Sequence, residues 1–237
     1  MRMAIKRLMS KALPDYLVKQ VTTELRLATR RIFTARSVRR RLVSEKGSRV
    51  NVGCGSNPIQ GWINLDVISH PGVHFWDCRS DLPFSDGSVA AIYSEHFFEH
   101  LDVETEARPF LCECLRCLQP RGVLRIVVPD AGAYLRAYGG PWELLAEMRP
   151  LDCTANGWRD KRLSWIYQTQ MQLMNAIFRQ RYDHKYAYDD ETLILVMREA
   201  GFADAIVQQF GVSIDPKMAA DTNDRQTESL YVEAVKG

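Results

Sequence analysis

The sequence predicts an α/β fold with a doubly wound, mostly parallel sheet, preceded by a basic helical extension. From Arg49 onward, short β-branched runs alternate with helical patterns, which is typical of a parallel sheet. The run VLRIVVP at 123–129 is apolar enough to lie in the centre of such a sheet. Residues 1–49 differ in charge, with 14 Lys and Arg against 3 acids, a net of +11, whereas residues 50–237 carry −9. The predicted domains are therefore an extension over 1–48 and an α/β domain over 49–237.

The basic extension is expected to be helical over residues 1–45, with a break near Pro14 and an end at Gly47. Apolar side chains recur at helical spacing and are predicted to form one stripe, comprising Leu13, Leu17, Val21, Leu25, Ala28 and Ile32. The opposite positions are mostly Lys, Arg, Thr and Gln. Such a helix either lies on an anionic membrane surface or packs its stripe on the acidic domain, and the sequence leaves both open.

The sheet is expected to begin with five strands, RVNV (49–52), WINLDVI (62–68), VHFWD (73–77), VAAIYS (89–94) and VLRIVVP (123–129). A helix over 103–118 precedes the fifth strand and ends at the turn Gln119-Pro120-Arg121-Gly122. Asp189 is predicted to cap a last helix that ends near Gly201. Two late strands follow, AIVQQFG (205–211) and SLYVEAV (229–235).

An aromatic-rich segment over 132–187 interrupts this alternation. It is interpreted as an insertion that forms a lid or an acceptor pocket, because aromatic rings stack on sugars and planar molecules. The same rings equally well build a small helical core, and this structural role is preferred for Trp165 and Phe178.

Polar and glycine residues follow three successive strands, where open α/β sheets bind their ligands. The Gly-Cys-Gly turn at 53–55 follows the first strand, and glycines there let the backbone approach a ligand closely. Asp66 follows the second strand and is placed to accept hydrogen bonds from ribose hydroxyls. Asp77 and Cys78 follow the third strand, where a carboxylate and the next amide suit an adenine ring.

The spacing argues against a nicotinamide dinucleotide. Such a site prefers G-x-G-x-x-G and an acid about 20 residues further on. Here the third glycine is missing, and Asp66 lies only 11 residues after Gly55.

Four runs together resemble class I S-adenosylmethionine-dependent methyltransferases, namely VNVGCGSNPIQGWINLDV, DLPFSDGSVAAIYSEHFFEHL, CLRCLQPRGVLRIVVPD and HKYAYDDETLILVMREAGF. More narrowly, they resemble predicted methyltransferases associated with cell-surface polysaccharide genes. The resemblance implies a Rossmann-like, seven-stranded sheet with a reversed last strand and helices on both faces. It also implies S-adenosylmethionine as cofactor, with the binding residues Asn51, Gly53, Cys54, Gly55, Asp66, Asp77, Cys78, Leu82 and Ser94.

The sequence departs from the family pattern at two positions of the first turn. Asn51 stands where an acidic residue is usual, and Asn57 stands where a third glycine is usual. Asn51 can exchange hydrogen bonds but cannot provide an anionic anchor for the cofactor's ammonium group.

Methyl transfer needs positioning of donor and acceptor, and a base can remove a proton from the acceptor. The predicted catalytic residues are Glu95, His96 and His100, which follow the fourth strand. His96 and His100 are four residues apart and would share one face of a helix. Glu99, Asp130 and His184 are further base candidates. A capping or orienting role is preferred for Glu99 and His100, and His184 is equally open to a structural role.

No metal site is predicted. Cys112, Cys114 and Cys117 form a C-x-C-x-x-C pattern, but the run FLCECLRCL reads as an amphipathic helix rather than as paired zinc knuckles. Lys6, Arg7 and Lys11 interrupt the apolar stretch that a secretory signal requires. The expected location is cytoplasmic. If the protein contacts the inner surface of the membrane, the extension is the part expected to do so.

The function expected from this sequence is methylation of a small molecule or a glycan. Two alternatives are an inactive adaptor that keeps the fold, and a nucleic-acid methyltransferase guided by residues 1–49. The charge of −9 over residues 50–237 argues against the nucleic-acid alternative. The acceptor, the methylated atom and the oligomeric state do not follow from the sequence.

Overall fold

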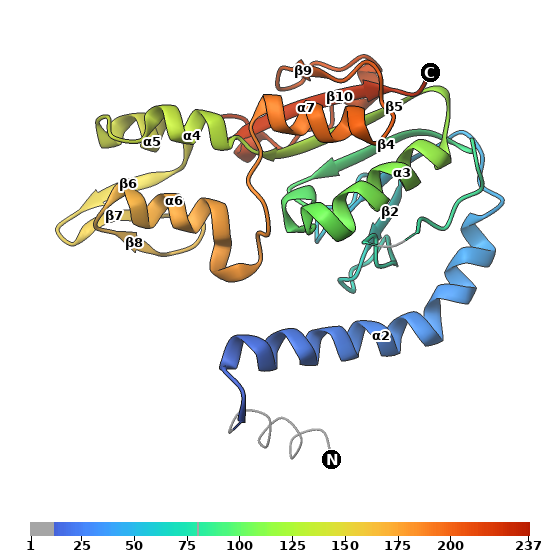
Figure 1. The fold of residues 1–237 in the computed structure, drawn as a ribbon, viewed down its shortest axis with the longest axis horizontal. Coiled ribbons are helices and arrows are strands. Elements are labelled where there is room, and N and C mark those ends of the chain that lie inside the picture. The colour runs from blue at the N-terminus through green and yellow to red at the C-terminus, as the bar shows by residue number, and fades with distance from the viewer. Residues whose placement is uncertain (1–11, 80) are drawn as a thin grey trace.

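The computed structural model describes residues 12–79 and 81–237, and its main element there is a seven-stranded sheet (Figure 1). The strands lie in the order β3-β2-β1-β4-β5-β10-β9. β1 to β5 are mutually parallel, and β10 runs antiparallel to both of its neighbours. The predicted doubly wound sheet with a reversed last strand is confirmed. Its strands are β1 (Ser48–Val52), β2 (Ile63–Asp66), β3 (Val73–Phe75), β4 (Val89–Glu95), β5 (Leu118–Pro129), β9 (Ile206–Gln208) and β10 (Ser229–Val235).

The two faces of the central strands are covered differently. Ile92 and Ile126 point into the main core, which they share with α3 (Arg108–Cys117), α7 (Asp190–Glu199) and the last turns of α2 (Asp15–Leu42). The alternate residues of the same strands face the other side. There Tyr93 and Val127 pack on Met218 of the short helix η4 (Pro216–Met218). The alternation follows from the two-residue period of a strand.

The turn before the fifth predicted strand belongs to β5 itself. β5 begins at Leu118, directly after α3, and therefore includes Gln119 to Gly122. Arg121 takes a positive φ of 65° here. A side chain at Gly122 would lie 2.9 Å from the carbonyl oxygen of Gln119 and 3.0 Å from that of Ala90, which explains the glycine.

Residues 131–187 fold into a separate lobe that continues from β5 (Figure 1). The lobe contains the three-stranded sheet β6-β7-β8 and a hydrophobic core of its own. Trp165 and Phe178 pack against this core, as preferred from the sequence. Its elements are α4 (Ala131–Ala137), α5 (Trp142–Met148), β6 (Leu151–Thr154), β7 (Gly157–Asp160), β8 (Ile166–Tyr167), α6 (Gln170–Arg179) and η3 (Gln180–Tyr182).

The predicted apolar stripe of the N-terminal helix does not pack on the domain, which was one of its two expected arrangements. α2 begins after Pro14 and is buried through four other residues, Val18, Leu27, Val38 and Leu42. Most of the predicted stripe faces outward, with Leu25 59% and Ile32 77% exposed. The predicted helix is confirmed, and on the side that meets the domain Arg31 and Arg39 pair with Asp77 and Asp81. The part of the prediction that covers residues 1–11 lies outside the described residues.

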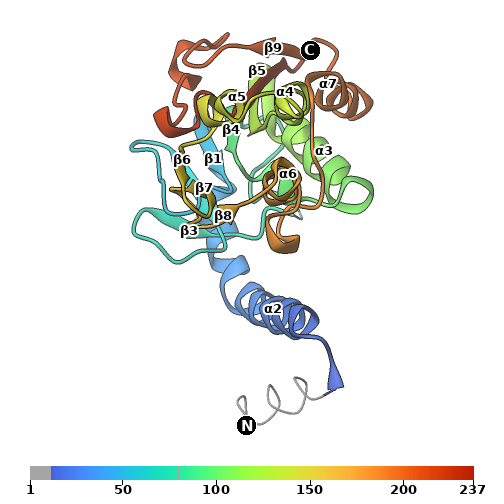
Figure 2. The same cartoon turned by 90° about the vertical axis from the view of Figure 1, so that its left-hand side faces the viewer.

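α2 reaches from the sheet to the inserted lobe, along one side of the molecule in both views (Figure 2). Near the sheet, Arg39 pairs with Asp81, and the Arg30 guanidinium lies 4.1 Å from the centre of the Phe75 ring. At its other end, Tyr16 stacks on Tyr182 with ring centroids 5.6 Å apart. The Lys19 ammonium lies 3.7 Å from the Asp183 carboxylate.

Buried charges join β5, β10 and the segment between β9 and β10. The fully buried Arg125 on β5 lies 2.5 Å from an Asp221 oxygen and 2.9 Å from a Glu233 oxygen. Arg125 also donates to the backbone carbonyls of Gln209 and Val212. The guanidinium is thus the centre of a network that holds the loop 209–221 on the sheet.

Replacing Arg125 with alanine should destabilise the fold strongly. The substitution leaves two buried carboxylates without their cation, which costs about 3–5 kcal/mol. Urea unfolding measures the change in the free energy of unfolding. Arg136→Ala is the control, because Arg136 is largely exposed and its ion pair with Asp130 is long, at 4.0 Å. This substitution should change the free energy of unfolding by less than about 1 kcal/mol. Equal effects of the two substitutions would contradict the role given to Arg125.

Candidate functional site

The Gly-Cys-Gly turn after β1 is fastened to the end of β2. The amides of Gly53 and Cys54 donate to the carbonyl of Leu65, and the Gly55 amide donates to Asp66 Oδ2 at 2.8 Å. Gly53 and Gly55 both take positive φ values, of 67° and 55°. The predicted turn and the predicted ribose-binding carboxylate therefore lie in direct contact.

Asp66 retains hydrogen-bonding capacity. Its two oxygens accept from the amides of Gly55 and Ile68, at 2.8 and 2.7 Å. A carboxylate offers about four acceptor positions, so two stay available for hydroxyl groups. Open space lies at Gly55, where an added side-chain carbon would meet nothing within 4 Å. These features fit a ribose placed against the turn.

Asn51 supports the turn from within. Its buried amide group donates to the carbonyl of Asn57 and to Asn64 Oδ1, at 3.3 and 3.2 Å. Asn64 in turn accepts from the amide of Ile59. Asn51 and Asn57 are the two departures from the family pattern, and the hydrogen bond between them stabilises the loop that follows β1.

Asp77 lies in a cluster of charges between the sheet and α2. Arg79 donates to both of its oxygens, at 3.0 and 2.8 Å, and Arg31 of α2 lies 3.2 Å away. Glu24 of α2 completes the cluster by accepting from Arg79. Burial works to raise the pKa of Asp77, but Arg79 and then Arg31 outweigh it and lower that pKa. An adenine amino group would have to share this carboxylate with two arginines.

Cys54 and Cys78 are both buried close to Asp66. Burial, with the negative charge of Asp66, raises the pKa of Cys54 to about 12 and that of Cys78 well above its usual value. Both side chains are therefore neutral thiols near pH 7. In a nucleotide site, Cys54 and Cys78 would therefore act through their backbone groups and small size rather than through a thiolate.

Ser94 and Leu82 are placed very differently. Ser94 is fully buried at the end of β4, and its hydroxyl oxygen has no hydrogen-bond partner among the described residues. Leu82 lies in the main core, and its amide donates to Glu113 Oε2 at 2.8 Å. Contact of Leu82 with a cofactor therefore stays a prediction.

The segment after β4 brings in partners from the late part of the chain. Glu95 accepts from the amide and hydroxyl of Thr222. His96 Nε2 lies 2.9 Å from the Ser229 hydroxyl, and His96 Nδ1 lies 3.3 Å from Glu99 Oε1. His96 also takes a positive φ of 51°, a strained conformation that clusters at functional sites.

His96 and His100 do not share a helix face, contrary to the sequence interpretation. The helix after β4, η1 (Phe98–His100), is a single turn that His96 precedes. His100 instead binds the inserted lobe, since its Nδ1 lies 2.9 Å from the carbonyl of Asp183. Glu99 is 2% exposed, and His184 Nε2 lies 3.9 Å from it.

Two cavities lie at predicted cofactor-binding residues, one beside the first turn and one beside Asp77. One of about 50 Å³ is lined by Asn51, Cys54, Tyr93, Glu95 and Thr222, among others. Another of about 310 Å³ lies between α2 and the end of β3, where its lining includes Arg31, Phe75, Trp76 and Asp77.

The Phe97 ring packs against the first turn. A side-chain carbon on Gly53 would fall 2.3 Å from this ring.

Several residues of this region were not found from the sequence. Arg31, Arg79 and Glu24 reach Asp77, and Thr222 and Ser229 reach Glu95 and His96. Their positions along the chain give no signal, because these contacts join segments up to 133 residues apart.

Residues 76–126 match the family model described as a methyltransferase domain. This match covers less than half of the chain. No curated protein matches the chain.

Solved structures with a similar course of the chain include several S-adenosylmethionine-dependent methyltransferases. One from Archaeoglobus fulgidus is 15% identical, with 94% of this chain and 100% of that chain covered and a TM-score of 0.47. A possible histamine N-methyltransferase from Thermotoga maritima is 15% identical, with 93% and 96% covered and a TM-score of 0.46. A third, from Mesorhizobium loti, is 16% identical, with 84% and 96% covered and a TM-score of 0.45. These likenesses add nothing to the fold assignment, which stands on the strand order.

The methyltransferase match, on a sheet of this strand order, confirms two predictions. The chain is a methyltransferase enzyme, and its cofactor is S-adenosylmethionine. Neither finding identifies the acceptor.

Gly53→Ala should disturb the first turn more than Gly55→Ala does. Both substitutions place a side chain at positive φ, which costs roughly 1–2 kcal/mol. Only at Gly53 does the new carbon overlap the Phe97 ring, and such overpacking costs about 1–3 kcal/mol more. Thermal unfolding of the two variants measures the difference, and a Gly55 variant that is the less stable of the pair would contradict it.

Proposed function

We propose that this enzyme transfers the methyl group of S-adenosylmethionine to a small molecule or glycan bound between the strand ends and the inserted lobe. The observation that carries the proposal is the contact between Asp66 and the Gly55 amide, which builds a ribose-binding corner at adjacent strand ends. When bound, the cofactor would supply a methyl group on a sulfonium: the acceptor's nucleophilic atom bonds to the methyl carbon as the carbon–sulfur bond breaks, and the neutral thioether S-adenosylhomocysteine leaves. The chain's own residues bind, orient and deprotonate.

Asp66 holds the ribose hydroxyls through its free acceptor positions, and the Cys54 and Gly55 backbone closes against the cofactor. Glu95 lines the cavity that Asn51 also lines, so its carboxylate provides the negative charge that Asn51 lacks. The charge sits opposite the turn, where it attracts the cofactor's ammonium group.

His96 is the proposed base. Its imidazole lies between the buried Glu99 carboxylate and the Ser229 hydroxyl, so Glu99 orients the ring and Nε2 can receive a proton. Glu95 and His100 hydrogen-bond to Thr222 and to the Asp183 carbonyl, respectively. In this proposal neither is a base, and both position the segment that carries His96.

The inserted lobe supports the choice of acceptor. Most of its aromatic rings form the lobe's core, and Tyr182 stacks on Tyr16 of α2, but Tyr138 and Tyr186 remain exposed. Exposed tyrosines stack on sugar rings and donate hydrogen bonds from the hydroxyl. The lobe returns to the sheet at η1, where the Lys185 and Tyr186 amides donate to the Glu99 carbonyl. The acceptor would therefore lie beside the segment Glu95–His100.

Asp66→Ala should weaken binding of the demethylated cofactor, S-adenosylhomocysteine, by about tenfold or more. Hydrogen bonds to a charged group contribute roughly 1.5–3 kcal/mol. Isothermal titration calorimetry measures the affinity, with the exposed Asp204→Ala as the control. Unchanged affinity in Asp66→Ala removes Asp66 from the site.

The acceptor class is tested separately, with cofactor carrying a labelled methyl group. We expect label on oligosaccharides or small hydroxylated acceptors and none on RNA or DNA. Label on nucleic acid would support the guided alternative. Cofactor binding without transfer to any acceptor, including water-soluble glycan mixtures, would support the adaptor alternative.

We further propose that α2 attaches the enzyme to an anionic membrane surface, which suits a lipid-linked glycan acceptor. Its outward face carries Leu25, Ile32 and Phe33, the last 78% exposed. Arg36 and Arg40 follow Ile32 at spacings of four and eight on the same side, and each basic residue near the headgroups contributes about 1 kcal/mol. Among the described residues, no helix combines the length and apolarity that crossing a bilayer requires.

Sedimentation with anionic liposomes at low salt tests this attachment. The wild-type chain should sediment with the vesicles, and the double variant Ile32→Ser/Phe33→Ser should stay in the supernatant. These substitutions leave the packed face of α2 intact, so the fold is preserved. Ile206→Ser/Val207→Ser on the exposed edge strand β9 is the control. Equal sedimentation of all three chains contradicts membrane attachment through α2.

A further inference from the structure

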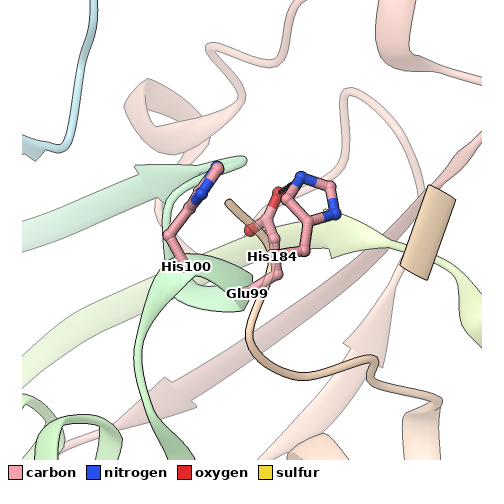
Figure 3. A group of neighbouring side chains, drawn as sticks. All are labelled: Glu99, His100 and His184. Carbon is pink, nitrogen blue, oxygen red and sulfur yellow. Dashed lines mark ion pairs between the residues drawn. The ribbon is translucent and has the colours of Figure 1, made fainter. Parts of the chain in front are cut away.

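Three potential metal ligands meet where η1 touches the inserted lobe. Glu99 and His100 belong to η1, and His184 lies on the segment that returns from the lobe (Figure 3). One ligand atom from each lies within 4.8 Å of the others. Two parts of the chain that are more than 80 residues apart thus bring two imidazoles and one carboxylate together.

Hydrogen bonds set the orientation of both imidazoles. His100 Nδ1 lies 2.9 Å from the Asp183 carbonyl, and His184 Nδ1 lies 2.6 Å from the Ile177 carbonyl. A carbonyl only accepts, so each Nδ1 carries the hydrogen and each neutral ring keeps its lone pair on Nε2. Metal-binding histidines in proteins are held in this way.

Glu99 is a buried carboxylate whose only ion-pair partners among the described residues are imidazoles. It is 2% exposed, and neither of its oxygens has a partner with full hydrogen-bond geometry there. The imidazoles of His96 and His184 lie within ion-pair distance, at 3.3 and 3.9 Å. A buried carboxylate that faces imidazoles alone is costly when they are neutral, and a bound cation lowers that cost.

A cavity adjoins these groups. It is lined by Glu99 and His184, together with residues of the lobe and of β5, and its volume is about 10 Å³. A space of this size corresponds to roughly one water-sized sphere, which suits a single ion.

We propose that Glu99, His100 and His184 bind one divalent transition-metal ion of the zinc type. Two imidazole nitrogens and one carboxylate oxygen form a donor set that zinc accepts while keeping a fourth position open. Magnesium and calcium prefer oxygen ligands and are excluded by the two imidazoles. Ligand atoms bound at about 2.0–2.1 Å lie roughly 3.4 Å apart in a tetrahedron, so the three groups move together on binding.

An ion bound here would clamp the inserted lobe to the strand ends, because His184 belongs to the lobe while Glu99 and His100 belong to η1. The metal site itself does not depend on methyl transfer, because its residues and their contacts involve no part of the cofactor-binding turn.

Zinc binding to the full-length chain tests the proposal without cofactor or acceptor. After chelator treatment and dialysis, the wild-type protein should bind one Zn²⁺ by isothermal titration calorimetry, and Co²⁺ should give the visible absorption of a tetrahedral site. Mg²⁺ should show no binding under the same conditions. His184→Ala and Glu99→Gln should each lower the Zn²⁺ affinity by more than about 100-fold, beyond the effect of losing an outer-shell partner.

His70→Ala is the matched control, because His70 Nδ1 also contacts a backbone carbonyl, that of Pro71 at 2.9 Å. It should bind Zn²⁺ as the wild type does. Glu99→Gln keeps the shape of the side chain, and circular dichroism shows whether each variant is folded. No zinc binding by the wild type, or equal binding by folded His184→Ala and Glu99→Gln, overturns the proposal, whatever the outcome for cofactor binding.

Discussion

One buried carboxylate fixes the position of the inserted lobe. Glu228 stands directly before β10 and is 1% exposed. It accepts from Arg149, Arg162 and Tyr134 of the lobe and from its near neighbour Arg225. Because a buried charge is costly unless it is paired and hydrogen-bonded, these contacts hold the lobe against the end of the sheet. The lobe meets the main domain again at η1, where the Lys185 and Tyr186 amides donate to the Glu99 carbonyl.

Local patterns in the sequence were enough to predict the sheet. Alternating apolar residues and turn signals located all seven strands of the described sheet, because strand periodicity and turn chemistry act over a few residues. For α2 the same patterns predicted a helix but not which of its faces meets the domain. The buried residues Val18, Leu27, Val38 and Leu42 lie outside the predicted stripe, and Arg31 and Arg39 pair with carboxylates far away in the sequence. The reversed last strand came from family resemblance rather than from periodicity.

The sequence predicted the place of a site residue only where that residue directly follows a strand of the sheet. The geometry of parallel strands brings Asp66 to the Gly55 turn, so its place could be inferred from order along the chain. Asp77 also follows its strand, but its arginine partners come from a loop and from α2. The sequence offers His184 only as an isolated base candidate. Its position in the sequence does not predict a contact with Glu99, because the two residues come together only when the whole lobe is folded.

The bridging position of α2 has a thermodynamic consequence. The helix contacts the charge cluster of Asp77 at the sheet and Tyr182 and Asp183 in the lobe. A ligand that changes the free energy of one set of these contacts also changes the free energy of the other through the same helix. Such coupling is reciprocal, so a ligand bound beside Asp77 and the order of the lobe would change each other's free energy by equal amounts. Under the proposed function, binding of the cofactor and binding of the acceptor would then be linked through α2.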